Sequence, residues 1–325
     1  MILLILVFML VVSSQSENSG NEPSSWVVQK QRGHSGWTFA DWCREKASLS
    51  PEAKHTVEVL LEKAGTTECE MADRQLSSLT QLTLESNQIR DIKPLASLTN
   101  LNWLSFDSNQ IRDIKPLASL TNLTELSLDS NQIGDIKPLA SLTNLKWLTL
   151  DSNQISDIKP LASLTNLNVL SLSSNQIKDI KPLKSLSKLN YLLLDANEIS
   201  NIKPLASLTN LTWLVLGENQ ISDIKPLASL TNLTDLSLDS NQIRDIKALK
   251  SLTNLNMLFL DSNQIRDIKA LKSLTNLVKL SLDSNQISDI KPLESLNKLT
   301  ELFLNENPIT SKTCPVKPES TCLWK

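Results

Sequence analysis

Histidine is nearly absent from this 325-residue sequence, which contains only His34 and His55. No glycine-rich phosphate loop is present, and no nucleophile can be paired with a general base. Acid–base catalysis and metal binding draw heavily on histidine. The sequence therefore predicts a protein that is not an enzyme and that carries no cofactor and no metal site.

A strong charge of either sign is also missing. Lys and Arg together number 32 and Asp and Glu 35, which gives a formal net charge of −3. Nucleic-acid binding depends on clustered contacts between cations and phosphates. The near balance of charge therefore predicts that nucleic acid is not a partner.

The hydrophobic run at the start of the chain is too short for an ordinary membrane span. It covers eleven residues, from Ile2 to Val12, which is the length of the apolar core of a secretory signal. Ser14 and Ser16 are the small residues expected before a cleavage site at Glu17. We expect a signal peptide over residues 1–16, which is either cleaved or retained as an anchor, and a location outside the cytoplasm. After signal removal no stable membrane insertion is expected; the protein is then secreted, periplasmic or at the cell surface.

One 22-residue stretch, LNWLSFDSNQIRDIKPLASLTN from Leu101 to Asn122, recurs without insertion or deletion. Counting Leu101 as position 1, the asparagine at position 9 returns in eleven copies: Asn87, Asn109, Asn131, Asn153, Asn175, Asn197, Asn219, Asn241, Asn263, Asn285 and Asn307. A strict period of this length is typical of a solenoid, in which stacked copies share a continuous core.

The copies follow the pattern L-x-x-L-x-L-x-x-N, with Phe106 at position 6 of the copy quoted. That copy returns through four further apolar residues, which are Ile111, Ile114, Leu117 and Leu120. The first part predicts a strand with positions 4 and 6 facing the core and positions 3, 5 and 7 facing away. Pro116 suits the start of a short 3₁₀ turn.

The motif resembles the leucine-rich repeat, in the 22-residue class found in internalins and in a regulatory subunit of phosphatase-1. The resemblance covers Leu79 to about Thr310. It implies an α/β solenoid shaped as a horseshoe or arc, with a parallel β-sheet on the concave face, short 3₁₀ turns on the convex face and a helical N-terminal cap. We divide the chain into residues 1–16 (signal), 17–35 (flexible linker), 36–78 (cap), 79–310 (eleven repeats) and 311–325 (C-terminal cap).

The N-terminal cap is expected to contain two helices. Thr38 is a candidate N-cap for a helix from Phe39 to Lys46, and Ser50-Pro51 and Gly65 are the start and stop signals of a second. The segment Cys69 to Leu76 is expected to lead into the first repeat as an edge strand. Both flanks, ADWCREKASLSPEAKHTVEVLLEKAG and NPITSKTCPVKPES, resemble those of secreted cyanobacterial leucine-rich repeat proteins, which implies a binding role outside the cytoplasm.

Four cysteines lie near the ends of the chain, at Cys43, Cys69, Cys314 and Cys322. Three pairings are formally possible. In a solenoid of this length ten strand spacings of about 4.8 Å separate the ends by roughly 50 Å, whereas a disulfide needs Cα atoms within about 7 Å. We therefore expect the pairs Cys43–Cys69 and Cys314–Cys322. The same distance argues against a four-cysteine zinc site.

Three rows of polar residues have simple structural interpretations. The asparagines at position 9 are expected to satisfy backbone groups of the turn and of the next copy. Position 7 is mostly acidic, and its carboxylates are expected to be solvated or bonded to the turn rather than to form a Ca²⁺ site; they are Glu85, Asp107, Asp129, Asp151, Asp195, Asp239, Asp261 and Asp283. Aspartates at position 13 and lysines at position 15 are expected to form weak exposed pairs rather than a polyanion site.

Position 3 differs from these rows, because every Trp of the repeats and the single Tyr of the chain fall there. We expect Trp147, Val169, Tyr191 and Trp213 to form one stripe on the concave face, widened by Leu193 and Val215 at position 5. The candidate ligand-binding residues are Trp103, Glu125, Trp147, Val169, Tyr191, Leu193, Trp213, Val215, Asp235, Met257 and Phe259. Glu125 and Asp235, together with Lys279 and Glu301, are expected to set a charge preference at the edges, and Phe303 adds a further apolar spot.

An exposed aromatic stripe that is bordered by charge is typical of a contact surface. The sequence therefore predicts an exported binding protein that recognises a protein partner. The alternatives are a glycan or cell-wall binder that uses Trp stacking, a surface protein with a purely structural role, and aromatic residues that only stack on one another across the strands.

Overall fold

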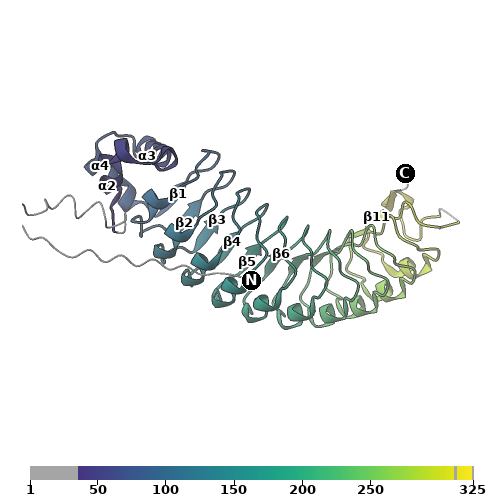
Figure 1. Ribbon diagram of the computed structural model, residues 1–325. Coiled ribbons are helices and arrows are strands. Elements are labelled where there is room, and N and C mark those ends of the chain that lie inside the picture. Colours follow the sequence, from purple (N-terminus) through teal and green to yellow (C-terminus); the bar gives the residue numbers. More distant parts are fainter. Residues whose placement is uncertain (1–35, 311–312, 324–325) are drawn as a thin grey trace, which may run out of the picture. The chain divides into compact units, whose positions relative to one another are not determined.

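The computed structural model describes residues 36–310 and 313–323. The expected signal peptide and linker, with His34, lie outside these residues. From Trp37 onward the chain forms one compact unit, which contains a single sheet of twelve parallel strands in sequence order, β1 to β12. In Figure 1 the strands follow the inner side of a curve and the short helical turns its outer side. The predicted leucine-rich-repeat solenoid is confirmed.

Each repeat contributes one three-residue strand at positions 3 to 5. The eleven strands are β1 Gln81–Thr83, β2 Trp103–Ser105, β3 Glu125–Ser127, β4 Trp147–Thr149, β5 Val169–Ser171, β6 Tyr191–Leu193, β7 Trp213–Val215, β8 Asp235–Ser237, β9 Met257–Phe259, β10 Lys279–Ser281 and β11 Glu301–Phe303. Neighbouring strands pair in register with an offset of one repeat, so each position of the repeat forms a straight row across the sheet.

The return path of each of the first ten repeats contains the predicted 3₁₀ turn. These turns span Lys93–Leu95, Lys115–Ser119, Lys137–Ser141, Lys159–Ser163, Lys181–Ser185, Lys203–Ser207, Lys225–Ser229, Lys247–Ser251, Lys269–Ser273 and Lys291–Ser295. Between strands and turns lies a continuous core of Leu and Ile, in which Leu148, Leu170 and Leu192 are completely buried. Every copy buries the same positions against its neighbours. The stability of one repeat therefore depends on the repeats stacked on either side of it.

The asparagine row ties each repeat to the one before it. Asn131 accepts a hydrogen bond of 3.0 Å from the backbone N–H of Ile111 and donates to the carbonyls of Phe106 and Leu128. The structural role of this row is therefore confirmed, but the expected direction was wrong. The bonds between repeats reach the preceding copy, because the turn after the strand folds back toward it.

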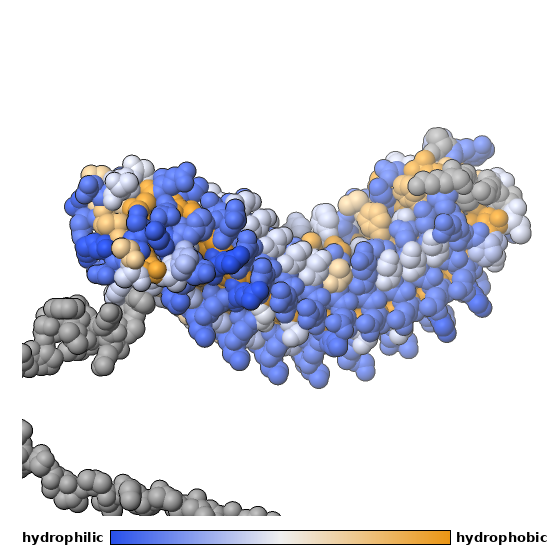
Figure 2. Space-filling view, turned by 45° about the horizontal axis from the view of Figure 1, so that its top comes forward, coloured by the Kyte–Doolittle hydropathy of each residue, from blue (hydrophilic) through white to orange (hydrophobic). Residues whose placement is uncertain are grey.

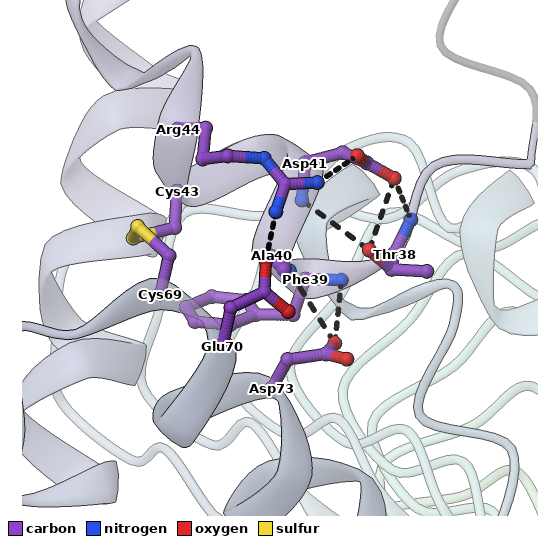
Figure 3. Close-up of polar contacts among 9 residues, drawn as sticks. All are labelled: Thr38, Phe39, Ala40, Asp41, Cys43, Arg44, Cys69, Glu70 and Asp73. Carbon is purple, nitrogen blue, oxygen red and sulfur yellow. Dashed lines mark hydrogen bonds and ion pairs between the residues drawn. A yellow bond between two sulfur atoms is a disulfide. The ribbon is translucent and has the colours of Figure 1, made fainter.

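The N-terminal cap consists of three α-helices, α2 Phe39–Arg44, α3 Pro51–Ala64 and α4 Cys69–Ser78, with a 3₁₀ turn at Lys46–Ser48. Thr38 forms a capping box with Asp41 at the start of α2 (Figure 3). Ser50 caps α3, and Gly65, with a φ of 65°, ends it in the left-handed conformation that glycine adopts without strain. The start and stop signals of α3 are thus confirmed.

The segment that begins at Cys69 is helix α4, so the edge strand expected there was wrong. Ala72 and Leu76, four residues apart, are both fully buried, which is the spacing of one helix face. The Asp73 carboxylate accepts hydrogen bonds from the backbone N–H groups of Phe39 and Ala40 and so joins α4 to the start of α2 (Figure 3). Arg44 pairs with Asp41 within α2 and with Glu70 of α4.

Both predicted disulfides are present. Cys43 is bonded to Cys69 with Cα atoms 5.5 Å apart, and Cys314 to Cys322 with Cα atoms 5.7 Å apart. At the C-terminal end a 3₁₀ turn, Glu319–Thr321, leads into β12, Cys322–Leu323, which pairs with β11. Within the described residues, no helix combines the length and apolar character needed to cross a bilayer.

Candidate functional site

The position-3 residues lie on the face of the sheet opposite the core. Register pairs place Trp147 beside Val169, Val169 beside Tyr191 and Tyr191 beside Trp213 on four consecutive strands. Trp147, Tyr191 and Trp213 keep 48%, 43% and 40% of their surface exposed. The predicted stripe is therefore continuous and open to solvent.

Aromatic stacking accounts for only part of this stripe. The rings of Tyr191 and Trp213 lie 6.2 Å apart at 37°, a tilted contact. Val169 separates Trp147 from Tyr191, and Leu193 and Val215, both partly buried, widen the stripe at position 5. We call the six residues Trp147, Val169, Tyr191, Leu193, Trp213 and Val215 the aromatic patch. In Figure 2 the outer side is mostly blue, whereas white and orange atoms gather in the hollow.

Carboxylates surround the aromatic patch. Along the position-3 row, Glu125 lies beside Trp147, and Asp235 lies beside Trp213. Positions 3, 5 and 7 of the six repeats that run from β3 to β8 contain six acidic residues and no Lys or Arg. We call these residues the acidic rim: Glu125, Asp129, Asp151, Asp195, Asp235 and Asp239.

The position-7 carboxylates are more ordered than a solvated row. The carboxylate of Asp151 accepts a 2.6 Å hydrogen bond from the Ser171 hydroxyl and a 2.7 Å bond from the backbone N–H of Ser173. Asp129 accepts a 2.7 Å bond from the backbone N–H of Asp151 in the same way. The row therefore bonds to the next strand, and its members are partly buried.

Burial also changes the protonation of this row. It raises the pKa of Asp129 to about 6; the hydrogen bond from Asp151 opposes the rise, and the nearby carboxylates of Asp151 and Asp107 add to it. Burial likewise raises the pKa values of Asp151 and Asp261. Carboxylates that keep their charge with difficulty are stabilised when a cation comes close.

The remaining predicted site residues lie beyond the aromatic patch. Trp103 on β2 is partly buried and is separated from Trp147 by the strand of Glu125. Met257 and Phe259 on β9 are separated from Trp213 by the strand of Asp235. The structure thus brings six of the eleven predicted residues together, places Glu125 and Asp235 at their border and leaves Trp103, Met257 and Phe259 outside.

The sequence reasoning missed one internal contact on this face. The Lys279 ammonium lies 5.8 Å from the ring centroid of Phe259 and 5.5 Å from that of Phe303, and it pairs with the Glu301 carboxylate at 2.7 Å. Lys279 and Glu301 therefore neutralise each other. The sequence did contain a signal for this contact. Two alternate copies have Phe at position 5, and the copy between them has Lys at position 3.

The convex side bears out the expected exposed pairs. Lys115 and Asp113 approach to 3.9 Å, and Lys181 and Asp179 to 3.7 Å, with mostly exposed side chains. The aspartates also accept hydrogen bonds from the lysine backbone N–H groups, as Asp113 does from Lys115. In the cap, a ring nitrogen of His55 lies 2.6 Å from the carbonyl of Asn87. Among the described residues, no cluster of three or more His, Cys, Asp or Glu side chains is arranged to hold a metal ion.

Family comparison agrees with this architecture. The model for leucine-rich repeats (two copies) matches residues 99–141, 143–185, 165–207, 209–251, 231–273, 253–295 and 275–313. Among curated proteins no match was found.

Several solved structures share the fold. An internalin (inlF) from Listeria monocytogenes is 35% identical, with 86% of this chain and 96% of that chain covered and a TM-score of 0.58. Internalin C2 from the same species is 36% identical over 67% of this chain and 96% of that chain, with a TM-score of 0.60. The leucine-rich-repeat ectodomain of the Arabidopsis thaliana receptor kinase GASSHO1/SCHENGEN3, in complex with CASPARIAN STRIP INTEGRITY FACTOR 2, is 26% identical over 74% of this chain and 31% of that chain, with a TM-score of 0.64.

Proposed function

The chain belongs to the leucine-rich-repeat family and is internalin-like, and on this premise we propose that it recognises a protein partner through the concave face of its sheet. The observation that carries the proposal is the aromatic patch, which keeps two Trp and one Tyr side chain exposed on four consecutive strands. Trp and Tyr are among the residues most enriched at binding hot spots.

The rigidity of the site supports this function. Each residue of the aromatic patch sits on a strand held by neighbours on both sides, and the leucine next to it in sequence is fixed in the core. A surface that is already ordered loses little conformational entropy when a partner binds. Recognition by such a site needs no movement of the repeats.

We place this function outside the cytoplasm. The two disulfides support this location, because disulfides persist mainly in oxidising compartments. The apolar segment at residues 2–12 supports export. N-terminal sequencing of the protein recovered from its host should give Glu17 as the first residue; full-length protein confined to the cytosol would contradict this placement.

Glycan binding is the second candidate function. Exposed Trp147 and Trp213 beside carboxylates offer flat rings for a sugar to stack on and acceptors for its hydroxyl groups. A glycan array with the purified protein separates the two candidates, since saturable binding to one class of glycan would favour this function over protein recognition.

The decisive experiment removes the aromatic patch. A variant with Trp147→Ala, Tyr191→Ala and Trp213→Ala is compared with wild type for capture of proteins from extracts of candidate target surfaces. Trp103→Ala is the matched control, because it removes a Trp at the same position of a repeat outside the patch. Loss of a saturable partner in the triple variant alone is expected, with an unchanged melting curve. If the folded triple variant captured the partner as well as wild type does, the proposed site would be wrong.

A further inference from the structure

We propose that the partner presents a Lys or Arg side chain to the aromatic patch, with its charged group above Val169 between Trp147 and Tyr191. This inference rests on the proposed function and specifies the chemistry of the partner. Two observations carry it, the one-sided charge of the acidic rim and the internal cation at Lys279.

The charge of the acidic rim has no internal counterpart on its own face. Six carboxylates and no base occupy positions 3, 5 and 7 across β3 to β8. The nearest lysines in the sequence, Lys146 and Lys188, precede strands β4 and β6, and the Lys188 ammonium donates to Asn166. Charge complementarity therefore favours binding of a basic partner. An acidic partner would be repelled by the like charge of the acidic rim.

Lys279 shows how this face accommodates a cation. Its ammonium lies between two aromatic rings on strands two apart and beside a carboxylate. Such a site combines attraction to the ring faces with an ion pair. The same face of the sheet thus already holds one cation between two aromatic rings, at position 5 of β9 and β11.

The aromatic patch offers related elements without the cation, with its rings at position 3 of the repeat rather than at position 5. Trp147 and Tyr191 are also two strands apart, on β4 and β6, which corresponds to about 10 Å at the usual strand spacing. Val169, on the strand between them, has a short apolar side chain in place of the lysine. An ammonium or guanidinium group from outside could approach both rings over Val169, on a face whose charged side chains from β3 to β8 are all acidic at positions 3, 5 and 7.

The test uses a phage-displayed library of random short peptides, selected on the full-length immobilised protein and counter-selected on the variant with Trp147→Ala, Tyr191→Ala and Trp213→Ala. Peptides that require the patch are expected to be enriched in Lys or Arg. Enriched peptides that require the patch but are neutral or acidic would overturn this inference and leave the proposed function standing. If no peptide requires the patch, both fail.

A second measurement tests whether the charge of the acidic rim contributes to peptide affinity. The enriched peptides are titrated against the variant Glu125→Gln with Asp235→Asn, in which the new amide oxygen can still accept the hydrogen bond that Asp235 takes from Thr234. Affinity should fall about tenfold, and wild-type binding should weaken as NaCl rises from about 50 to about 500 mM. Glu58→Gln with Glu62→Gln, on the exposed side of α3, removes the same charge away from the sheet. Equal affinity for all three proteins would overturn the inference.

Discussion

The side-chain oxygen of Asn175 accepts a 3.0 Å hydrogen bond from the backbone N–H of Ile155, which lies in the preceding repeat. The amide nitrogen of the same side chain donates to the carbonyls of Leu150, Leu172 and Ser173 at 3.0 to 3.1 Å. One largely buried side chain therefore satisfies backbone groups on two repeats.

Replacing Asn175 by Ala should destabilise the centre of the solenoid by about 3 kcal/mol or more, because it leaves several buried backbone groups without partners. Chemical denaturation measures the loss, and hydrogen exchange of the Ile155 amide locates it, since unfolding of a repeat array need not be two-state. Asn144→Ala is the control, because its exposed amide donates only to the Thr121 carbonyl. Similar losses in the two variants would contradict the role of the buried row.

The second prediction concerns the pH dependence of stability at Asp129. Burial raises its pKa to about 6 in the folded protein, above the ordinary pKa of an aspartate side chain. A raised folded pKa stabilises the fold fully below the unfolded pKa, and this contribution is lost as the pH rises through about 6. Asp129→Asn should therefore stabilise the protein at pH 7.5, by about 1 kcal/mol after allowance for solvent screening, and should lose this advantage near pH 4.

Denaturation curves of wild type and Asp129→Asn at both pH values provide the measurement. Asp245→Asn is a control of opposite sign, because a hydrogen bond from the Lys247 backbone lowers the pKa of that exposed carboxyl. Its carboxylate stabilises the fold at neutral pH, and that contribution is lost at acidic pH below its ordinary pKa. If Asp129→Asn had the same effect at pH 4 and pH 7.5, the raised pKa would be refuted.

The third prediction concerns the cap disulfide between Cys43 and Cys69, which closes a sequence separation of 26 residues. Replacing both cysteines by Ser should cost about 3 kcal/mol, because the unfolded chain regains the entropy of that loop. Cys314→Ser with Cys322→Ser opens a separation of only 8 residues, so its cost should be about 1 kcal/mol smaller. Thermal melts of the two variants give the comparison, and a larger loss at the C-terminal end would contradict the loop-length argument.

Much of this fold could be predicted from the sequence because its period is strict. A constant 22 residues between copies fixes the register, so Trp147, Val169 and Tyr191 must lie side by side once position 3 is known to face away from the core. Capping residues such as Ser50 and Gly65 similarly mark the ends of α3 through their local chemistry.

The incorrect or missing predictions concern features that the 22-residue period does not determine. Helix α4 has no repeat to define it, and its buried residues Ala72 and Leu76 are too few to distinguish a short helix from a strand by period alone. The direction of the asparagine bonds depends on how the turn folds back. The contact of Lys279 with Phe259 and Phe303 depends on side-chain conformations across three strands.

The Lys279 arrangement leads to a last prediction, in which the chain fills its own aromatic patch. Val169→Lys places an ammonium on the strand between Trp147 and Tyr191, as Lys279 lies between two phenylalanines. If the patch receives a cation from its partner, the built-in lysine competes with it, and the affinity for basic peptides should fall more than about tenfold.

Val169→Leu, which adds bulk without charge, should keep most of the binding. Melting curves should show both variants folded, because Val169 lies on the solvent side of the sheet. If Val169→Lys and Val169→Leu weakened binding equally, the loss would be steric and the site would not be one for a cation.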